Sequence, residues 1–103
     1  MNEQERIKLL NEHSLEFVTM LGGQVTALDL PGKACTMNFD VHTRFCHSVD
    51  VVQGGFVTAM LDMAMSHAAF GTDHTVVNVS SLEIKTTYLE PTRAGQLRCV
   101  GNI

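Results

Sequence analysis

Residues 53–71 place two adjacent glycines before a long apolar run, and one carboxylate, Asp62, lies in the middle of that run. The run is apolar around most of a helical circumference, which predicts a helix buried on nearly all sides. Its exceptions are Thr58, Asp62 and Ser66, which are spaced four residues apart and therefore share one narrow face. Because an unpaired buried charge is strongly destabilising, this polar stripe is expected to line a pocket or to hydrogen-bond Asp62 inside the fold.

The glycine pair, Gly54 and Gly55, stands where the expected helix begins. The first N–H groups of a helix have no acceptor within the helix, so they can bind an anion or a polarised carbonyl. Glycines also allow a helix to pack closely on a sheet. Gln53, which precedes them, is either a residue of the site or simply the residue at which the chain enters the helix. Backbone donors near one carboxylate favour a site for acyl chemistry, while the packing interpretation stays open.

The composition fits a single globular domain spanning residues 1–103, because 45% of the residues are hydrophobic and 17% are charged. A net charge of −4 argues against nucleic-acid binding. No uncharged apolar run reaches the ~18 residues of a membrane span, and the acidic N-terminus does not resemble a signal peptide. Three cysteines without CxxC spacing indicate reduced thiols, which predicts a cytoplasmic protein. The spacing of His and Cys predicts no metal site.

Local patterns predict an α+β domain with the order α-β-β-α-β-β, in which an antiparallel sheet wraps the apolar helix. The expected helices cover residues 2–20 and 53–71, and the expected strands cover residues 24–30, 35–41, 75–89 and 96–103. Asn2 with Glu5 forms a capping-box pattern at the first helix. Residues 35–41 alternate apolar and polar side chains, as in a half-buried antiparallel strand. In residues 75–89 the apolar parity switches, which predicts a bulge near residues 80–81.

The glycine pair and the carboxylate are followed by a stretch that ends in Tyr-Leu-Glu-Pro, residues 88–91. Together these features resemble the hotdog-fold thioesterases, in particular the phenylacetic-acid-degradation (PaaI-like) subgroup. The matching residues are Gln53-Gly54-Gly55, Asp62 seven positions after the second glycine, and residues 81–91. The resemblance covers most of the chain and implies a hotdog fold, an antiparallel sheet wrapped around a central helix. Members continue for roughly one more hairpin, so a C-terminally truncated domain is expected.

The resemblance implies acyl-CoA thioesterase activity, which hydrolyses a thioester to a free acid and coenzyme A. Asp62 falls on the general base or nucleophile, and Gly54 falls on the residue whose backbone N–H polarises the thioester carbonyl. Substrate-binding positions are implied at His47, Gln53, Gly55, Ser66 and Ser81. Such enzymes pair two subunits so that the carboxylate of one faces the glycine N–H of the other, which implies a homodimer or a dimer of dimers. No cofactor is implied.

Two positions depart from the family pattern. Gln53 stands where the family has His, and His47 stands where Asn is common. Histidine titrates near neutral pH, so His47 is expected to change the pH profile or the reaction partner. Two other functions therefore stay open. One is a hotdog module that binds acyl-CoA or lipid without turnover, and the other is an incomplete fragment in which no pocket forms.

Overall fold

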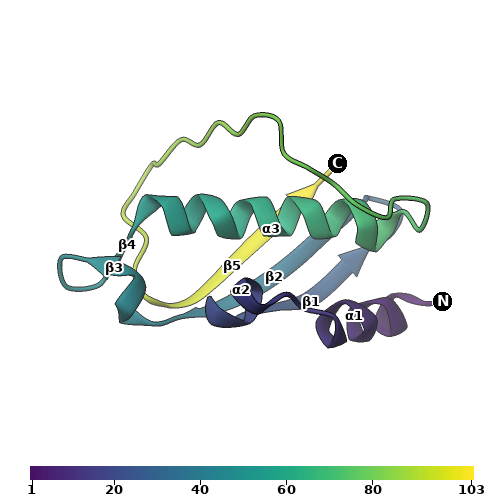
Figure 1. The fold of residues 1–103 in the computed structure, drawn as a ribbon, viewed down its shortest axis with the longest axis horizontal. Coiled ribbons are helices and arrows are strands. Elements are labelled where there is room, and N and C mark those ends of the chain that lie inside the picture. Colours follow the sequence, from purple (N-terminus) through teal and green to yellow (C-terminus); the bar gives the residue numbers. More distant parts are fainter.

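A long helix, α3 (Gly54–Thr72), lies across one face of a three-stranded antiparallel sheet in the computed structural model, which describes residues 1–103 (Figure 1). The sheet has the order β1-β2-β5, with β1 at Gly23–Asp29, β2 at Ala34–Val41 and β5 at Gly95–Asn102. Two helices precede the sheet, α1 at Glu3–Glu12 and α2 at Glu16–Met20. Short elements link β2 to α3: η1 at Thr43–Phe45, β3 at Cys46–His47 and β4 at Val51–Val52.

The central strand β2 has the alternating pattern that the sequence predicts. Cys35, Met37 and Phe39 have no exposed surface, and the residues between them are only half-buried. The register places Met37 opposite Val25 of β1 and Cys99 of β5, so the buried face continues across all three strands. This apolar face is the surface on which α3 packs.

Helix α3 is buried on one face, and the predicted burial on nearly all sides is wrong. Its buried side chains are those of Met60, Met63, Ala64 and Ala68, whose spacing of three or four residues forms a single stripe. On the other side Met65 is 43% exposed. A sheet of three strands covers only one side of a helix, which leaves the opposite side open to solvent and to the segment that follows.

That following segment, residues 74–92, is named here the return segment. It runs back along α3, on the opposite side of the helix from β1 and β2, until it reaches β4 (Figure 1). The expected strand at residues 75–89, with its bulge near residues 80–81, is wrong, because the return segment joins no sheet. Its β-branched residues favour extended backbone, but a strand also needs a neighbouring strand to accept its hydrogen bonds, and none lies beside it.

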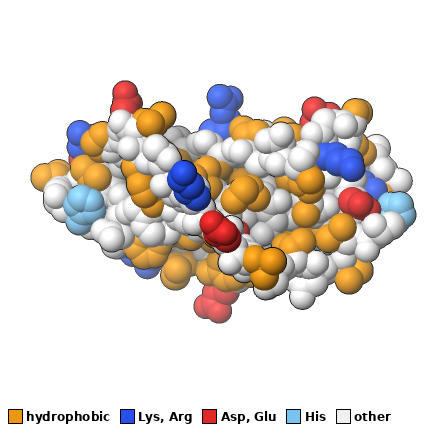
Figure 2. Space-filling model, turned by 90° about the horizontal axis from the view of Figure 1, so that it is seen from above, with side chains coloured by type: hydrophobic (Ala, Val, Ile, Leu, Met, Phe, Trp, Pro, Cys, Tyr) orange, Lys and Arg blue, Asp and Glu red, His pale blue; other side chains and the backbone are white.

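The return segment leaves apolar side chains in solvent. Val77 and Leu89 are 92% and 88% exposed, and Leu82 is fully exposed. Figure 2 views the molecule from this side and shows hydrophobic side chains along most of its length. An exposed apolar face of this extent is typical of a surface that contacts another molecule.

The N-terminal region forms two helices in place of the single helix expected at residues 2–20. The predicted cap at its start is confirmed, since Asn2 Oδ1 accepts the Glu5 N–H at 2.8 Å. Near its end, Asn11 exchanges two side-chain hydrogen bonds with the backbone of Val25, at 2.9 and 3.0 Å. These bonds hold the end of α1 on β1, and the chain turns at Ser14 before α2 begins.

None of the helices combines the length and the apolar character that crossing a membrane requires. The three cysteines are free thiols, and burial raises the pKa of Cys35 to about 11. A thiol with such a raised pKa is a weak nucleophile at neutral pH, so Cys35 acts as a small apolar side chain of the core.

Strand β5 lies directly against the backbone of α3 at Gly101. A Cβ atom at this position would lie 2.5 Å from the carbonyl carbon and oxygen of Ala64 in α3. No side chain fits in that space, so glycine is what allows β5 to lie directly on the helix backbone.

We therefore expect Gly101→Ala to destabilise the fold by roughly 1–3 kcal/mol, because the added methyl group forces β5 and α3 apart. Urea unfolding followed by circular dichroism measures this loss. Gly55→Ala is the matched control, since a Cβ at Gly55 meets nothing within 4 Å. Equal stability of the two variants would contradict the close packing of β5 on α3.

Candidate functional site

The start of α3 presents two unpaired backbone donors. The Gln53 N–H donates to Phe45 O at 2.9 Å, but the N–H groups of Gly54 and Gly55 have no acceptor within the chain. The Gln53 side chain makes no capping bond to them. Because the N-terminus of a helix carries a partial positive charge, this end of α3 favours an anion or a polarised oxygen.

The phenol of Tyr88 fixes the return segment to this end of the helix. Its hydroxyl donates to the carbonyl oxygen of Gly54 at 2.7 Å and lies 2.6 Å from Thr58 Oγ1. Thr58 Oγ1 in turn lies 3.0 Å from Thr86 Oγ1. A Cβ at Gly54 would lie 3.1 Å from the Tyr88 ring and hydroxyl, so the absence of a side chain at Gly54 makes room for the phenol.

The carboxylate of Asp62 is half-buried in the middle of α3 and faces the return segment. Ser81 Oγ donates to Asp62 Oδ1 at 2.7 Å. Asp62, Ser66 and Ser81 line one shallow hollow of about 240 Å³ between helix and segment. Of the predicted polar stripe, Asp62 and Ser66 therefore line a hollow, whereas Thr58 bonds to Tyr88 and Thr86. The hydrogen-bond partner of Asp62 is Ser81 and not Thr58 or Ser66.

A second hollow of about 360 Å³ lies at the start of α3, where Gly54, His47 and Tyr88 are among the lining residues. The His47 ring is exposed, and its Nδ1 lies 3.2 Å from Ser48 Oγ. Gln53 is exposed and lines neither hollow. Directly after the return segment, Arg93 forms an ion pair with Asp50 at 2.7 Å beside this region.

The structure thus separates the residues predicted for one site into two groups. His47, Gln53 and the glycine pair lie at the start of α3, whereas Asp62, Ser66 and Ser81 lie along its middle. Asp62 follows Gly54 by eight residues, which places the two about 12 Å apart along the helix axis. Within one chain they therefore cannot act on the same carbonyl group.

Tyr88 is the residue that the sequence-based site prediction missed. It lies in the Tyr-Leu-Glu-Pro stretch, where a single phenol follows an alternating run, but nothing local shows that its hydroxyl reaches a helix 34 residues earlier. The structure brings together no group of three or more His, Cys, Asp or Glu side chains able to hold a metal ion.

Two solved structures are similar to this chain. One is a phenylacetic acid degradation-related protein from Ralstonia eutropha JMP134 with a provisional assignment as a thioesterase. The similarity has a TM-score of 0.78 and 30% identity, and it covers 94% of this chain and 74% of that one. This chain belongs to the phenylacetic acid degradation-related, PaaI-like thioesterase family.

The second structure is the PaaI protein of the phenylacetic acid degradation operon of E. coli, with a TM-score of 0.75 and 15% identity over 94% of this chain and 67% of that one. Its similarity supports the hotdog fold for this chain. No family model matches the sequence, and no curated protein matches it. Family membership therefore comes from the structure of the chain together with its identity to the Ralstonia protein.

The hydroxyl of Tyr88 gives a testable prediction for the return segment. Tyr88→Phe keeps the ring but removes the bonds to Gly54 and Thr58, so trypsin should cleave after Lys85 about two to five times faster, as expected for the loss of about 0.5–1 kcal/mol of attachment. Mass spectrometry of timed digests measures the initial rate. Val49→Ala, at an 89% exposed position outside the return segment, should leave the rate unchanged. Equal rates for Tyr88→Phe and wild type would show that the phenol does not hold the segment.

Proposed function

We propose that this protein is an acyl-CoA thioesterase that hydrolyses a thioester to the free acid and coenzyme A. The observation that carries the proposal is the pair of unpaired N–H groups at the start of α3, in a family member that also has a half-buried carboxylate on the same helix. Both solved structures are named for phenylacetic acid degradation, which supports aryl acyl groups as substrates, and the apolar helix suits medium-chain acyl groups equally well.

Gly54 is proposed to polarise the thioester carbonyl through its backbone N–H. As the carbonyl carbon is attacked, negative charge develops on its oxygen, and a fixed donor at a helix N-terminus stabilises that charge. One such donor typically contributes about 3–4 kcal/mol to the transition state. Gly55 offers a second N–H, while Gln53 and His47 are proposed to bind the substrate beside this donor.

Asp62 is proposed to act as the general base, or as a nucleophile that forms an anhydride which water then opens. As a base, it takes a proton from water while the water oxygen bonds to the carbonyl carbon. The carbon–sulfur bond then breaks, and the thiolate of coenzyme A receives the proton. The Ser81 hydroxyl, bonded to Asp62 at 2.7 Å, fixes the carboxylate and helps place the water, with Ser66 beside it.

A homodimer, or a dimer of dimers, is proposed to complete the site. Because Gly54 and Asp62 of one chain are about 12 Å apart, the donor of one copy must meet the carboxylate of the other. The exposed apolar side chains of the return segment support an interface on this side of α3. The three free thiols support a reducing, cytoplasmic setting.

The test of the activity is Asp62→Asn, which keeps the shape of the side chain but removes its basicity. We expect kcat/KM for phenylacetyl-CoA and decanoyl-CoA to fall by about a hundredfold or more. Release of coenzyme A, detected with a thiol reagent, measures the rate. Asp40→Asn makes the same chemical change on an exposed β2 position and should keep full activity.

Hydrolysis by Asp62→Asn at the wild-type rate would reject the assignment of Asp62. Stoichiometric binding of acyl-CoA by the wild type, without release of thiol, would identify a binding protein in place of an enzyme. His47 and Gln53 are where such a loss of turnover would arise, because they replace the residues usual in the family.

Mixed assemblies test whether the site is shared between copies. Gly54→Pro removes the N–H at the first helical position, where the helix backbone tolerates proline, and the φ of −55° and ψ of 131° at Gln53 suit a residue before proline. Because a Cβ at Gly54 would lie 3.1 Å from the Tyr88 ring and hydroxyl, Tyr88→Ala, which removes the phenol but keeps the N–H, is the control that separates the two effects. Gly54→Pro and Asp62→Asn should each be inactive alone. Co-expressed, they should recover about a quarter of the wild-type activity, since half of the dimers are mixed and one of their two sites is intact. Absence of recovery in purified mixed dimers would contradict a shared site.

A further inference from the structure

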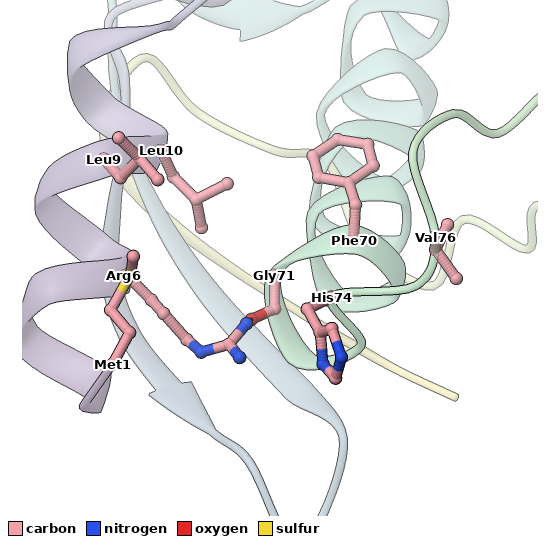
Figure 3. Close-up of a pocket in the computed structure, with 8 residues that line it drawn as sticks. All are labelled: Met1, Arg6, Leu9, Leu10, Phe70, Gly71, His74 and Val76. Carbon is pink, nitrogen blue, oxygen red and sulfur yellow. The ribbon is translucent and has the colours of Figure 1, made fainter.

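A groove separates α1 from the C-terminal half of α3 and belongs to neither hollow described above. It consists of two adjoining cavities of about 340 and 580 Å³, which share Leu9, Leu10 and Phe70 as walls. Figure 3 shows the smaller cavity, with leucines from α1 on one side and Phe70 from α3 on the other. We name this feature the α1–α3 groove. Its walls are apolar, and its polar groups lie at its two ends.

Arg6 occupies one end of the groove and keeps unused hydrogen-bonding capacity. It reaches from α1 to the end of α3, where Nη1 donates to the carbonyl oxygen of Gly71 at 3.0 Å. Nε is shielded from solvent and has no acceptor, which is an unfavourable state for a buried donor. Because Nη1 is engaged, the edge formed by Nε and Nη2 is the free one, and two N–H groups on that edge match the two oxygens of a carboxylate.

No acidic side chain of the protein forms an ion pair with Arg6. Two acidic side chains of the adjoining elements have other hydrogen-bond partners: Glu3 accepts the Leu30 N–H at 3.0 Å, and Asp73 accepts the N–H and the hydroxyl of Thr75. The His74 ring lies beside the guanidinium in Figure 3 and adds imidazole nitrogens to this end of the groove. The end of the groove is therefore selective for an anion.

The far end of the groove carries no fixed charge. His67 lines it, with Nδ1 2.7 Å from the carbonyl oxygen of Met63, so Nδ1 is the protonated nitrogen. Burial lowers the pKa of His67, which keeps the ring neutral at physiological pH. His13 makes the same kind of bond to Leu9 O at 2.9 Å. The groove thus combines one strong cation with a long apolar wall.

We propose that the α1–α3 groove binds an amphipathic carboxylic acid, with its carboxylate on the Nε–Nη2 edge of Arg6 and its apolar body between the leucines of α1 and Phe70. The carboxylate supplies the acceptor that Nε lacks, and the flexible side chain of Met1, at the mouth of the cavity, moves to admit it. The groove shares no lining residue with the hollows around Gly54 and Asp62, so this proposal does not rest on thioester hydrolysis.

Isothermal titration with octanoate and 4-phenylbutyrate tests the proposal, with 1-octanol and 4-phenylbutanol as neutral analogues. We expect both acids to bind the wild type at least about tenfold more tightly than the matching alcohols. Arg6→Gln keeps a donor for Gly71 but removes the charge, and it should weaken binding of the acids about tenfold or more. Lys8→Gln is the matched control on the exposed side of α1 and should bind as the wild type does.

Leu9→Glu provides a second variant in case Arg6→Gln does not fold. Leu9 is 45% exposed, so the change is tolerable, and it places a repelling carboxylate in both cavities. We expect it to abolish binding of the acids. Backbone NMR shifts on adding octanoate should centre on Phe70, Gly71 and His74.

Three outcomes would overturn the proposal. They are no binding of either acid at concentrations on the order of 10 mM, equal binding of acid and alcohol, and shifts centred on Gly54 and Gly55.

Discussion

The contact between α3 and the apolar face of β2 and β5 determines where every other part of this protein lies. Met60 and Ala64 pack on that face, and Gly101 allows β5 to touch the helix backbone. Once the helix is fixed there, its glycine-rich start, its carboxylate and its end take defined positions. The polar stripe must then face away from the sheet, towards the return segment.

The return segment shows how side chains can hold a stretch that has no strand partner. Ser81 bonds to Asp62, and Tyr88 bonds to Gly54, so the segment is attached at the two positions of α3 to which the proposed chemistry is assigned. The same contacts bring its hydroxyl groups to the helix, while its apolar side chains point into solvent. The path of the return segment along α3 therefore has two results: it fixes the side chains of the candidate site, and it exposes the apolar side chains of the segment.

Features that depend on local pattern were predictable from the sequence, and features that depend on distant partners were not. The alternation in residues 35–41, the cap at Asn2 and the helix after Gln53 follow from neighbouring residues and are confirmed. Residues 75–89 have strand composition, but pairing requires a partner that no local pattern reveals. The residues proposed for the site share a spacing that is visible in the sequence, whereas Tyr88 and Arg6 make contacts across the fold that no local pattern predicts.

The two ends of α3 also differ in how their partial charges are balanced. At the last turn, the Arg6 guanidinium sits against the carbonyl of Gly71 and compensates the negative pole of the helix. At the first turn, the N–H groups of Gly54 and Gly55 meet no acceptor within the chain, so the positive pole stays bare. The dipole of α3 is therefore compensated at its C-terminal end only. Its positive end produces an uncompensated electrostatic field that points outward from the glycine pair.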